Sequence, residues 1–149
     1  MVKEHPDIRL IIIGSGEEKT KIDRFISANN LDQNIILLGY QKNVFKFLKS
    51  CKAFILSSLW EDPGFVLIEA MVSDCVVLSS NCPNGPKEIL EKNNGLLFQS
   101  NSETDFIYNF NHLISLSDSE KKIIKINAKK KIKNYSIFHH YQQLQKLFI

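Results

Sequence analysis

Two glutamates, Glu61 and Glu69, flank a Pro-Gly pair at residues 63–64. The apolar run 53–56 before them is long enough for a buried strand, and residues 65–72 after the pair are apolar with good helix formers. In an open parallel sheet, the loop between such a strand and helix lies at the ligand crevice. The spacing therefore predicts that both carboxylates lie near the start of one helix, beside a ligand.

That helix start has the properties of an anion site. The backbone N–H groups of Gly64, Phe65 and Val66 would point unpaired into the crevice, where the helix dipole favours negative charge. Gly64 has no Cβ, so a ligand can approach the backbone closely. Carboxylates do not bind phosphate, so Glu61 and Glu69 are expected to bind hydroxyl groups.

A nucleotide sugar combines these features, because it carries a diphosphate between two hydroxyl-rich rings. In this interpretation Glu69 accepts hydrogen bonds from the ribose diol and Glu61 accepts them from the sugar. The alternative is structural: a loop carboxylate at Glu61 and a solvated helix-face glutamate at Glu69.

The surrounding sequence resembles a known family. Glu61 and Glu69 with seven residues between them match the E-x7-E pattern of retaining glycosyltransferases of GT-B architecture (glycosyl transferases group 1, or family 4), which have two Rossmann-like domains. Residues 56–71 resemble that family's signature loop and helix. The Gly-Pro-Lys-Glu-Ile segment at 85–89 and the Asn-Tyr-Ser-Ile-Phe segment at 134–138 are also similar to family segments.

The resemblance implies transfer of a hexose or N-acetylhexosamine to a glycan, lipid or polysaccharide acceptor. Glu61 would be the catalytic residue, through the sugar hydroxyls and not as a nucleophile, and Ser58 belongs to the same matched loop. The helix N–H groups would stabilise the nucleoside diphosphate leaving group. The donor is expected to be a UDP-sugar, with GDP- or ADP-sugars as alternatives, and no cofactor or metal is expected.

Two earlier turns are also candidates for donor binding. Gly14 and Gly16 follow an aliphatic strand predicted at 8–13, but Lys19 replaces the third glycine of a G-x-G-x-x-G motif. The turn either opens towards the nucleotide, as the resemblance implies, or only lets strand and helix pack closely. Gly39 and Tyr40 end the next strand, where Tyr40 could stack on the base or be structural.

The order of elements predicts an α/β fold with a Rossmann-like parallel sheet of about five strands, flanking helices and a helical C-terminus. The expected strands are 8–13, 35–38, 53–56, 74–80 and 96–98. The expected helices are 17–29, 44–50, 65–72, 87–91 with Pro86 first, one from Glu103, 119–133, and one capped by Ser136. The chain is expected to be one incomplete nucleotide-sugar-binding domain, 1–149, with the sheet in 8–100 and the C-terminal helices in 102–149.

Composition limits the other possibilities. The net charge of +3 is too small to indicate nucleic-acid binding, although a lysine excess near the C-terminus allows a weak attraction to an anionic membrane. No apolar run is long enough to span a membrane, no secretion signal is evident, and the three cysteines have no metal-ligand spacing. We therefore expect a cytoplasmic protein, with the inner face of the membrane as an alternative location.

The resemblance covers only the later part of the family's second domain. Within this resemblance, the sequence has no counterpart of the family's arginine and lysine that contact the diphosphate. It also has no counterpart of the family's acceptor-binding first domain. The expected partners are thus a nucleotide sugar and a missing N-terminal domain or partner subunit, and the chain alone is expected to be inactive. The alternative is a non-catalytic, degenerate domain acting in protein interaction or in a split enzyme. A phosphoacceptor signalling domain is disfavoured, because the first strand ends in Gly-Ser-Gly and not in acidic residues.

Overall fold

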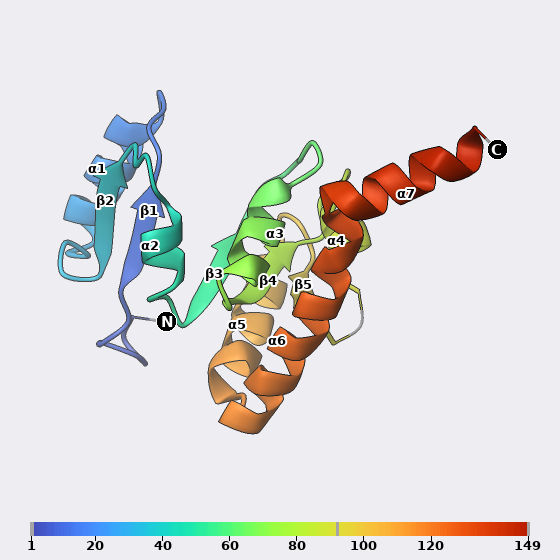
Figure 1. Cartoon of the computed structure of the whole chain (residues 1–149). Helices are drawn as coiled ribbons and strands as arrows, with labels where there is room; N and C mark the ends of the chain where they lie inside the picture. Colours follow the sequence, from blue (N-terminus) through green and yellow to red (C-terminus); the bar gives the residue numbers. More distant parts are fainter. Residues whose placement is uncertain (1, 92, 149) are drawn as a thin grey trace. The chain divides into compact units, whose positions relative to one another are not determined.

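The computed structural model describes residues 2–91 and 93–148 (Figure 1). The chain divides into two compact units, Met1–Val44 and Phe45–Ile149. Each unit contains parallel strands and flanking helices, so the predicted α/β class is confirmed.

Unit 1 is one strand-helix-strand motif. Its elements are β1 (Leu10–Ile13), α1 (Lys19–Ala28) and β2 (Ile35–Gly39), and β1 pairs with β2 in parallel. The buried Asn34 donates side-chain hydrogen bonds of 2.9 Å to the carbonyls of Pro6 and Ile8, which holds the residues before β1 against the start of β2. Strand β1 begins two residues later than predicted because the Ile8 amide donates to the His5 carbonyl in a turn.

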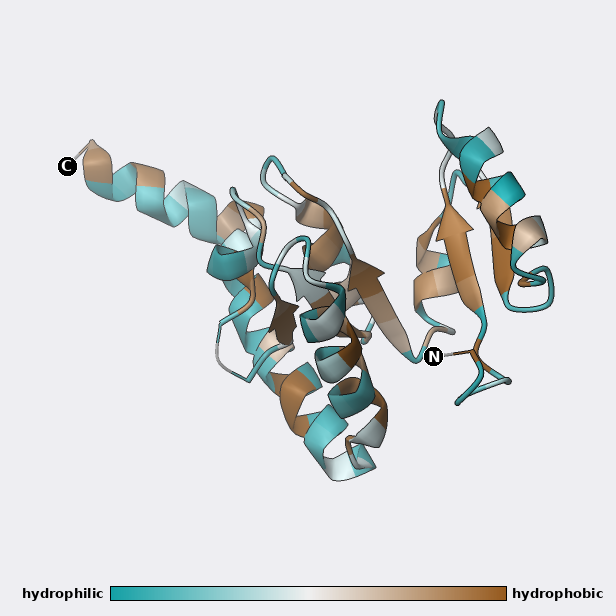
Figure 2. Ribbon diagram, turned by 180° about the vertical axis from the view of Figure 1, so that it is seen from behind, coloured by the Kyte–Doolittle hydropathy of each residue, from teal (hydrophilic) through white to brown (hydrophobic). Residues whose placement is uncertain are grey.

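Unit 2 holds a three-stranded parallel sheet in the order β3-β4-β5. Its elements are α2 (Phe45–Leu48), β3 (Ala53–Leu56), α3 (Phe65–Val72), β4 (Val76–Ser80), α4 (Pro86–Ile89), β5 (Leu96–Phe98), α5 (Glu103–Ser115), α6 (Asp118–Ile132), the 3-10 helix η1 (Lys133–Tyr135) and α7 (Ile137–Leu147). All five residues of the central strand β4 are buried, as expected for a parallel strand covered on both faces. The apolar strands appear in brown in Figure 2.

The five predicted strands are therefore present and parallel, but hydrogen bonds group them into two sheets, not one. Strands β3 and β5 and helix α3 have the predicted bounds. Strand β4 begins two residues later than predicted, because Asp74 has a φ of 66° and the Cys75 amide still donates to the carbonyl of Ala70 in α3. The short helix α4 starts at Pro86 as predicted but ends at Ile89.

The C-terminal helices begin at serine caps. Ser136 accepts from the His139 amide, as predicted for a cap, and Ser102 accepts from the Asp105 amide. Ser117 forms a capping box with Glu120, and two hydrogen bonds from Ser117 lower the pKa of the Glu120 carboxyl. A serine cap marks the start of each of the helices α5, α6 and α7, which explains why this part of the chain forms three separate helices.

Asp74 ties the turn before β4 to helix α6. Its carboxylate lies 2.8 Å from the Lys129 amine and 3.5 Å from that of Lys125. The hydrogen bond from Lys129 is the main cause of a lowered pKa for Asp74. Since the Asp74 side chain is 49% exposed, this ion pair contributes only modestly to stability.

We expect Asp74→Asn to lower the free energy of unfolding by about 0.5–1 kcal/mol at neutral pH, measured by urea denaturation. Asparagine tolerates the positive φ, so the loss reports the charge. Because the folded pKa lies below the ordinary value of 3.8, the contribution is present above pH 3.8 and lost as pH falls through the folded value. The two proteins should therefore become equally stable in strong acid. A difference that persisted there would show that the charge is not its cause.

Candidate functional site

Helix α3 starts as an anion site requires. Gly64 precedes the helix with φ 80° and ψ 39°, a left-handed conformation that suits glycine, and its carbonyl accepts from the Leu67 amide at 3.0 Å. Phe65 and Val66 occupy the first two helical positions, so their amides have no intrahelical acceptor. No other acceptor for them occurs in residues 2–91 and 93–148. Phe65 is 59% exposed and Val66 is half-buried, whereas Gly64 is buried, so the helix start is only partly open to a ligand.

The Glu61 carboxylate lies beside this helix start. A Cβ built on Gly64 would lie 3.6 Å from the Cβ and Cγ atoms of Glu61 and 3.7 Å from its Oε2 atom. The Glu61 side chain therefore folds over Gly64, and it is half-buried. It thus lies beside Gly64, the residue before the first helical positions, where the helix dipole favours an acidic side chain.

Glu69 lies on the outer face of α3. It is four residues after Phe65 and three before Val72, and those two apolar side chains are 59% and 57% exposed. The opposite, inner face of the helix consists of Leu67, Ala70 and Met71, all buried. Glu69 is half-buried, about one turn along the helix from the amides. It stands on the same exposed face as the residue that opens the helix.

A second loop, 81–85, supports the loop that carries Glu61. The Glu61 amide donates to the Pro83 carbonyl at 3.3 Å, and the Ser80 hydroxyl donates to the Ser58 carbonyl at 2.5 Å. Gly85 has φ 126°, and a Cβ there would overlap the carbonyl oxygen of Pro63. The position of Glu61 thus depends on Gly85, which sequence reasoning noted only within a family-like segment.

Exposed apolar side chains surround the same loop. Leu59 is 62% exposed and Trp60 is 59% exposed, directly before Glu61. Sequence reasoning assigned them no role, although the only tryptophan of the chain in a polar loop was a signal. Like Phe65 at the first helical position, they are exposed apolar side chains of the segment that carries Glu61.

Unit 1 gathers the other predicted residues at the carboxyl ends of its two strands. The Gly14 amide donates to the Gly39 carbonyl at 2.9 Å, and Tyr40 follows with 78% of its surface exposed. Gly14 and Gly39 have φ values of 134° and 65°. A Cβ on Gly14, Gly16 or Gly39 would meet no atom within 4 Å, so close packing does not explain these glycines. The union of this group with the α3 group in one site stays a prediction.

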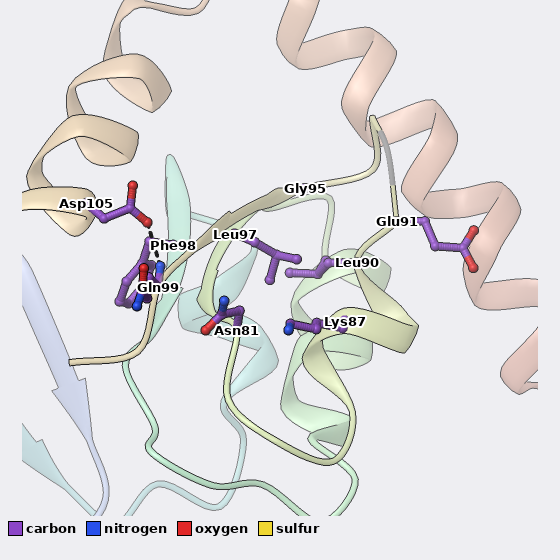
Figure 3. A pocket seen from close by; sticks show the side chains of 9 residues that line it. All are labelled: Asn81, Lys87, Leu90, Glu91, Gly95, Leu97, Phe98, Gln99 and Asp105. Carbon is purple, nitrogen blue, oxygen red and sulfur yellow. Dashed lines mark hydrogen bonds between the residues drawn. The ribbon is translucent and has the colours of Figure 1, made fainter. Parts of the chain in front are cut away.

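A separate depression of about 910 Å³ lies at the carboxyl ends of β4 and β5 (Figure 3). It is lined by Asn81, Lys87, Leu90, Glu91, Gly95, Leu97, Phe98, Gln99 and Asp105. Its polar groups are largely engaged: Asp105 accepts from the Gln99 amide at 2.5 Å, and Asn81 accepts from the Ser100 amide at 3.0 Å. Neither Glu61 nor Glu69 lines it, so it is distinct from the α3 site.

Cys75 is a buried packing residue. Burial raises the pKa of the Cys75 thiol to about 11, so it stays protonated at neutral pH and donates to the Leu48 carbonyl at 2.8 Å. Cys82 is buried and Cys51 half-buried. Among residues 2–91 and 93–148, no helix is long and apolar enough to cross a membrane.

Comparison with known proteins identifies the family. Residues 1–131 match the family model of glycosyl transferases group 1. An uncharacterized glycosyltransferase of Methanocaldococcus jannaschii is 46% identical over 90 residues, 60% of this chain and 22% of that protein. The N-acetylgalactosamine-N,N'-diacetylbacillosaminyl-diphospho-undecaprenol 4-alpha-N-acetylgalactosaminyltransferase of Campylobacter jejuni is 28% identical over 130 residues, 87% of this chain and 35% of that protein.

Comparison with solved structures gives the same result as the family match. A Staphylococcus aureus TarM mutant in complex with Fondaparinux, alpha-GlcNAc-glycerol and UDP superposes with a TM-score of 0.88 and 29% identity, over 99% of this chain and 30% of that one. The chain spans about a fifth to a third of the length of these relatives. The parallel α/β architecture and the family model lead to one conclusion: the chain belongs to the glycosyl transferases group 1 family, which has the GT-B fold.

Proposed function

We propose that this chain binds the nucleotide sugar in a retaining glycosyltransferase, as its donor-binding domain. The observation that carries the proposal is the start of α3, where the amides of Phe65 and Val66 are unpaired. The Glu61 carboxylate lies beside Gly64, which precedes those amides, and Glu69 lies on the exposed face about one turn further on. One anion site with a carboxylate on each side matches a diphosphate between two sugar rings.

Each group has a distinct role in this proposal. The amides of Gly64, Phe65 and Val66 bind the diphosphate, Glu69 accepts hydrogen bonds from the ribose diol, and Glu61 accepts them from the transferred sugar. Ser58 positions the loop through its carbonyl. A Cβ on Gly14, Gly16 or Gly39 would meet no atom within 4 Å, and these glycines with the exposed Tyr40 are the proposed contacts to the base.

Catalysis in the whole enzyme would be mainly electrostatic. As the bond to the sugar breaks, negative charge grows on the nucleoside diphosphate, and preorganised amides stabilise it. The related TarM structure contains UDP, which supports a UDP-sugar as donor. The Campylobacter jejuni relative is named for transfer of N-acetylgalactosamine to a lipid diphosphate, which supports an N-acetylhexosamine or hexose and a glycan or lipid acceptor. The proposed place of action is the cytoplasm or the cytoplasmic face of a membrane.

Donor binding is tested by titrating the chain with UDP-, GDP- and ADP-sugars, followed by ligand-observed NMR or calorimetry. We expect saturable binding at millimolar concentration or tighter, with preference for one base. Inorganic diphosphate should compete, because the amides of α3 recognise the phosphates. If none of the nucleotide sugars perturbs the protein at millimolar concentration, the proposal is wrong for this chain.

The second candidate function is a non-catalytic or split-enzyme subunit, which the sheet edges favour. Strand β1 pairs only with β2, and β3 pairs only with β4, among residues 2–91 and 93–148. Leu10 and Ile11 in β1 are 40% and 38% exposed, high for such an aliphatic strand. An unpaired edge is a template for another strand. Size-exclusion chromatography with light scattering distinguishes this function, because a monomer at high concentration would argue against self-association through an edge.

A further inference from the structure

Two of the three cysteines of the chain lie at one place in unit 2. The Cys75 thiol donates a 2.8 Å hydrogen bond to the carbonyl oxygen of Leu48, and the Cys51 amide donates to the same oxygen at 3.2 Å. One oxygen atom therefore contacts both the sulfur of Cys75 and the backbone of Cys51. The proposed donor site at α3 uses neither cysteine, so that proposal does not account for their proximity.

The ladder between β3 and β4 holds the two chain segments that carry these cysteines. Cys51 lies two residues before Ala53, and Cys75 lies directly before Val76. Ala53 and Val76 are Cα partners in this parallel ladder. Neighbouring strands lie about 4.8 Å apart, and a disulfide usually joins residues whose Cα atoms are about 4.4–6.8 Å apart. The backbone thus holds the two segments at about the separation that a disulfide requires.

The two thiols also interact electrostatically. Burial is the main cause of the raised pKa of Cys75, and the Cys51 thiol is the next, because a thiolate at Cys51 would repel negative charge on Cys75. Such repulsion weakens with distance. It therefore agrees with the hydrogen bonds to Leu48 in placing the two side chains near each other.

Exposure and position separate the three cysteines. Cys51 is half-buried, whereas Cys75 and Cys82 are each 2% exposed, so a small oxidant from solvent reaches Cys51 first. Cys82 follows the far end of β4, and the five residues of that strand, at about 3.3 Å each, separate it from Cys75 by about 16 Å or more. A disulfide cannot span that distance. In the folded chain, Cys51 is therefore the partner available to Cys75.

We propose that Cys51 and Cys75 are an oxidation site, where a peroxide converts the two thiols to an intramolecular disulfide. The Cys51 sulfur attacks one peroxide oxygen and the O–O bond breaks. This leaves a sulfenic acid at Cys51, and the thiol proton leaves with the second oxygen as water. The Cys75 sulfur then attacks the Cys51 sulfur, the S–S bond forms, and the S–O bond breaks to release a second water with the Cys75 proton. The two thiols lose two electrons, which the peroxide gains.

The new bond would close a loop around the segment that carries the candidate donor site. Residues 52–74 contain β3, the loop with Glu61 and all of α3. A cross-link between the ends of such a segment stabilises a protein mainly by restricting its unfolded chain. We therefore expect the oxidised chain to melt about 5–15 °C higher than the reduced chain.

The test is peptide mapping of the full chain after treatment with hydrogen peroxide in native buffer. Free thiols are then alkylated in denaturant, and the protein is digested without reductant. We expect one linked pair of peptides, which contains Cys51 and Cys75, and an alkylated Cys82. Linked peptides that contain Cys82, disulfide-linked dimers, or oxidation of Cys51 to a sulfinic acid without a link would overturn the proposal.

Oxidation of the same chain in urea is the control for the folded geometry. In the unfolded chain, Cys75 should link mainly to Cys82, which is its nearest cysteine in sequence, because shorter loops close more readily. The same Cys51–Cys75 preference in urea would show that the fold does not select this pair.

Two variants complete the test. Cys51→Ser should abolish both the link and the rise in melting temperature, and its half-buried position makes it easy to accommodate. The matched control, Cys82→Ser, should keep both, and the map of the unchanged chain decides if this variant does not fold. None of these measurements needs a nucleotide sugar. Failure of the donor titration, carried out on the reduced protein, would therefore leave this proposal standing, and the reverse holds as well.

Discussion

Replacing Gly85 by alanine should strongly destabilise unit 2. The added Cβ would overlap the carbonyl oxygen of Pro63 and lie 2.7 Å from its carbonyl carbon. Both are backbone atoms, so no side-chain rotation relieves the clash. The φ of 126° adds further strain for any residue with a Cβ. We expect a loss of about 2–5 kcal/mol in the free energy of unfolding, measured by denaturant titration.

The functional consequence follows from the same contact. Loop 81–85 must move away from Pro63, and this releases the hydrogen bond from the Glu61 amide to the Pro83 carbonyl. The Glu61 carboxylate then loses its position over Gly64, so nucleotide-sugar binding should weaken along with stability. The control for stability is Gly16→Ala, because a Cβ there meets no atom within 4 Å and the residue has no positive φ. A Gly85→Ala protein as stable as the control would contradict the loop packing described here.

Hydrophobic pattern and turn chemistry predicted most of the fold. The buried strands are runs of aliphatic residues, and the bounds of β3, α3 and β5 matched because polar or Gly/Pro-containing segments end them on both sides. The late start of β4 was not predictable from hydrophobicity. It depends on the left-handed conformation of Asp74 and on a helix-ending hydrogen bond from Cys75 to Ala70.

The division of the strands between two sheets was also beyond the sequence pattern. Alternating strands and helices predict parallel pairing, but they do not say which strands are neighbours. The structure pairs β3 with β4 and β1 with β2. Such pairing depends on the direction in which each connecting helix crosses over and on which other strands occupy the remaining sheet edges.

At the candidate site, the sequence located the helix start and both carboxylates but not their support. Helix position and glycine conformation follow from local residue types, so Gly64 and Glu69 could be placed from the sequence. The contact between Gly85 and Pro63 joins two loops 22 residues apart. Likewise, the sequence does not show that the Trp60 ring is exposed to solvent, because this exposure is a property of the folded loop.

The two glutamates can be assigned separately by comparing UDP with a UDP-sugar. Glu69→Ala should weaken binding of both ligands by about tenfold to a hundredfold. Both ligands contain the ribose, and in the proposed site the Glu69 carboxylate accepts hydrogen bonds from its two hydroxyl groups. Glu61→Gln should weaken only the UDP-sugar. UDP should bind Glu61→Gln equally well or somewhat more tightly, since a negative charge beside the diphosphate amides has been removed. Calorimetric titration of the three proteins with both ligands measures this.

The direction of the UDP result decides whether the geometry is correct. If Glu61→Gln weakened UDP and UDP-sugar equally, Glu61 would support the helix start and not the sugar. If Glu69→Ala left both affinities unchanged, its place on the exposed face with Phe65 and Val72 would be that of a solvated glutamate. Because neither side chain is buried in the core, both variants should keep the stability of the unchanged chain within about 1 kcal/mol, which separates a binding defect from a folding defect.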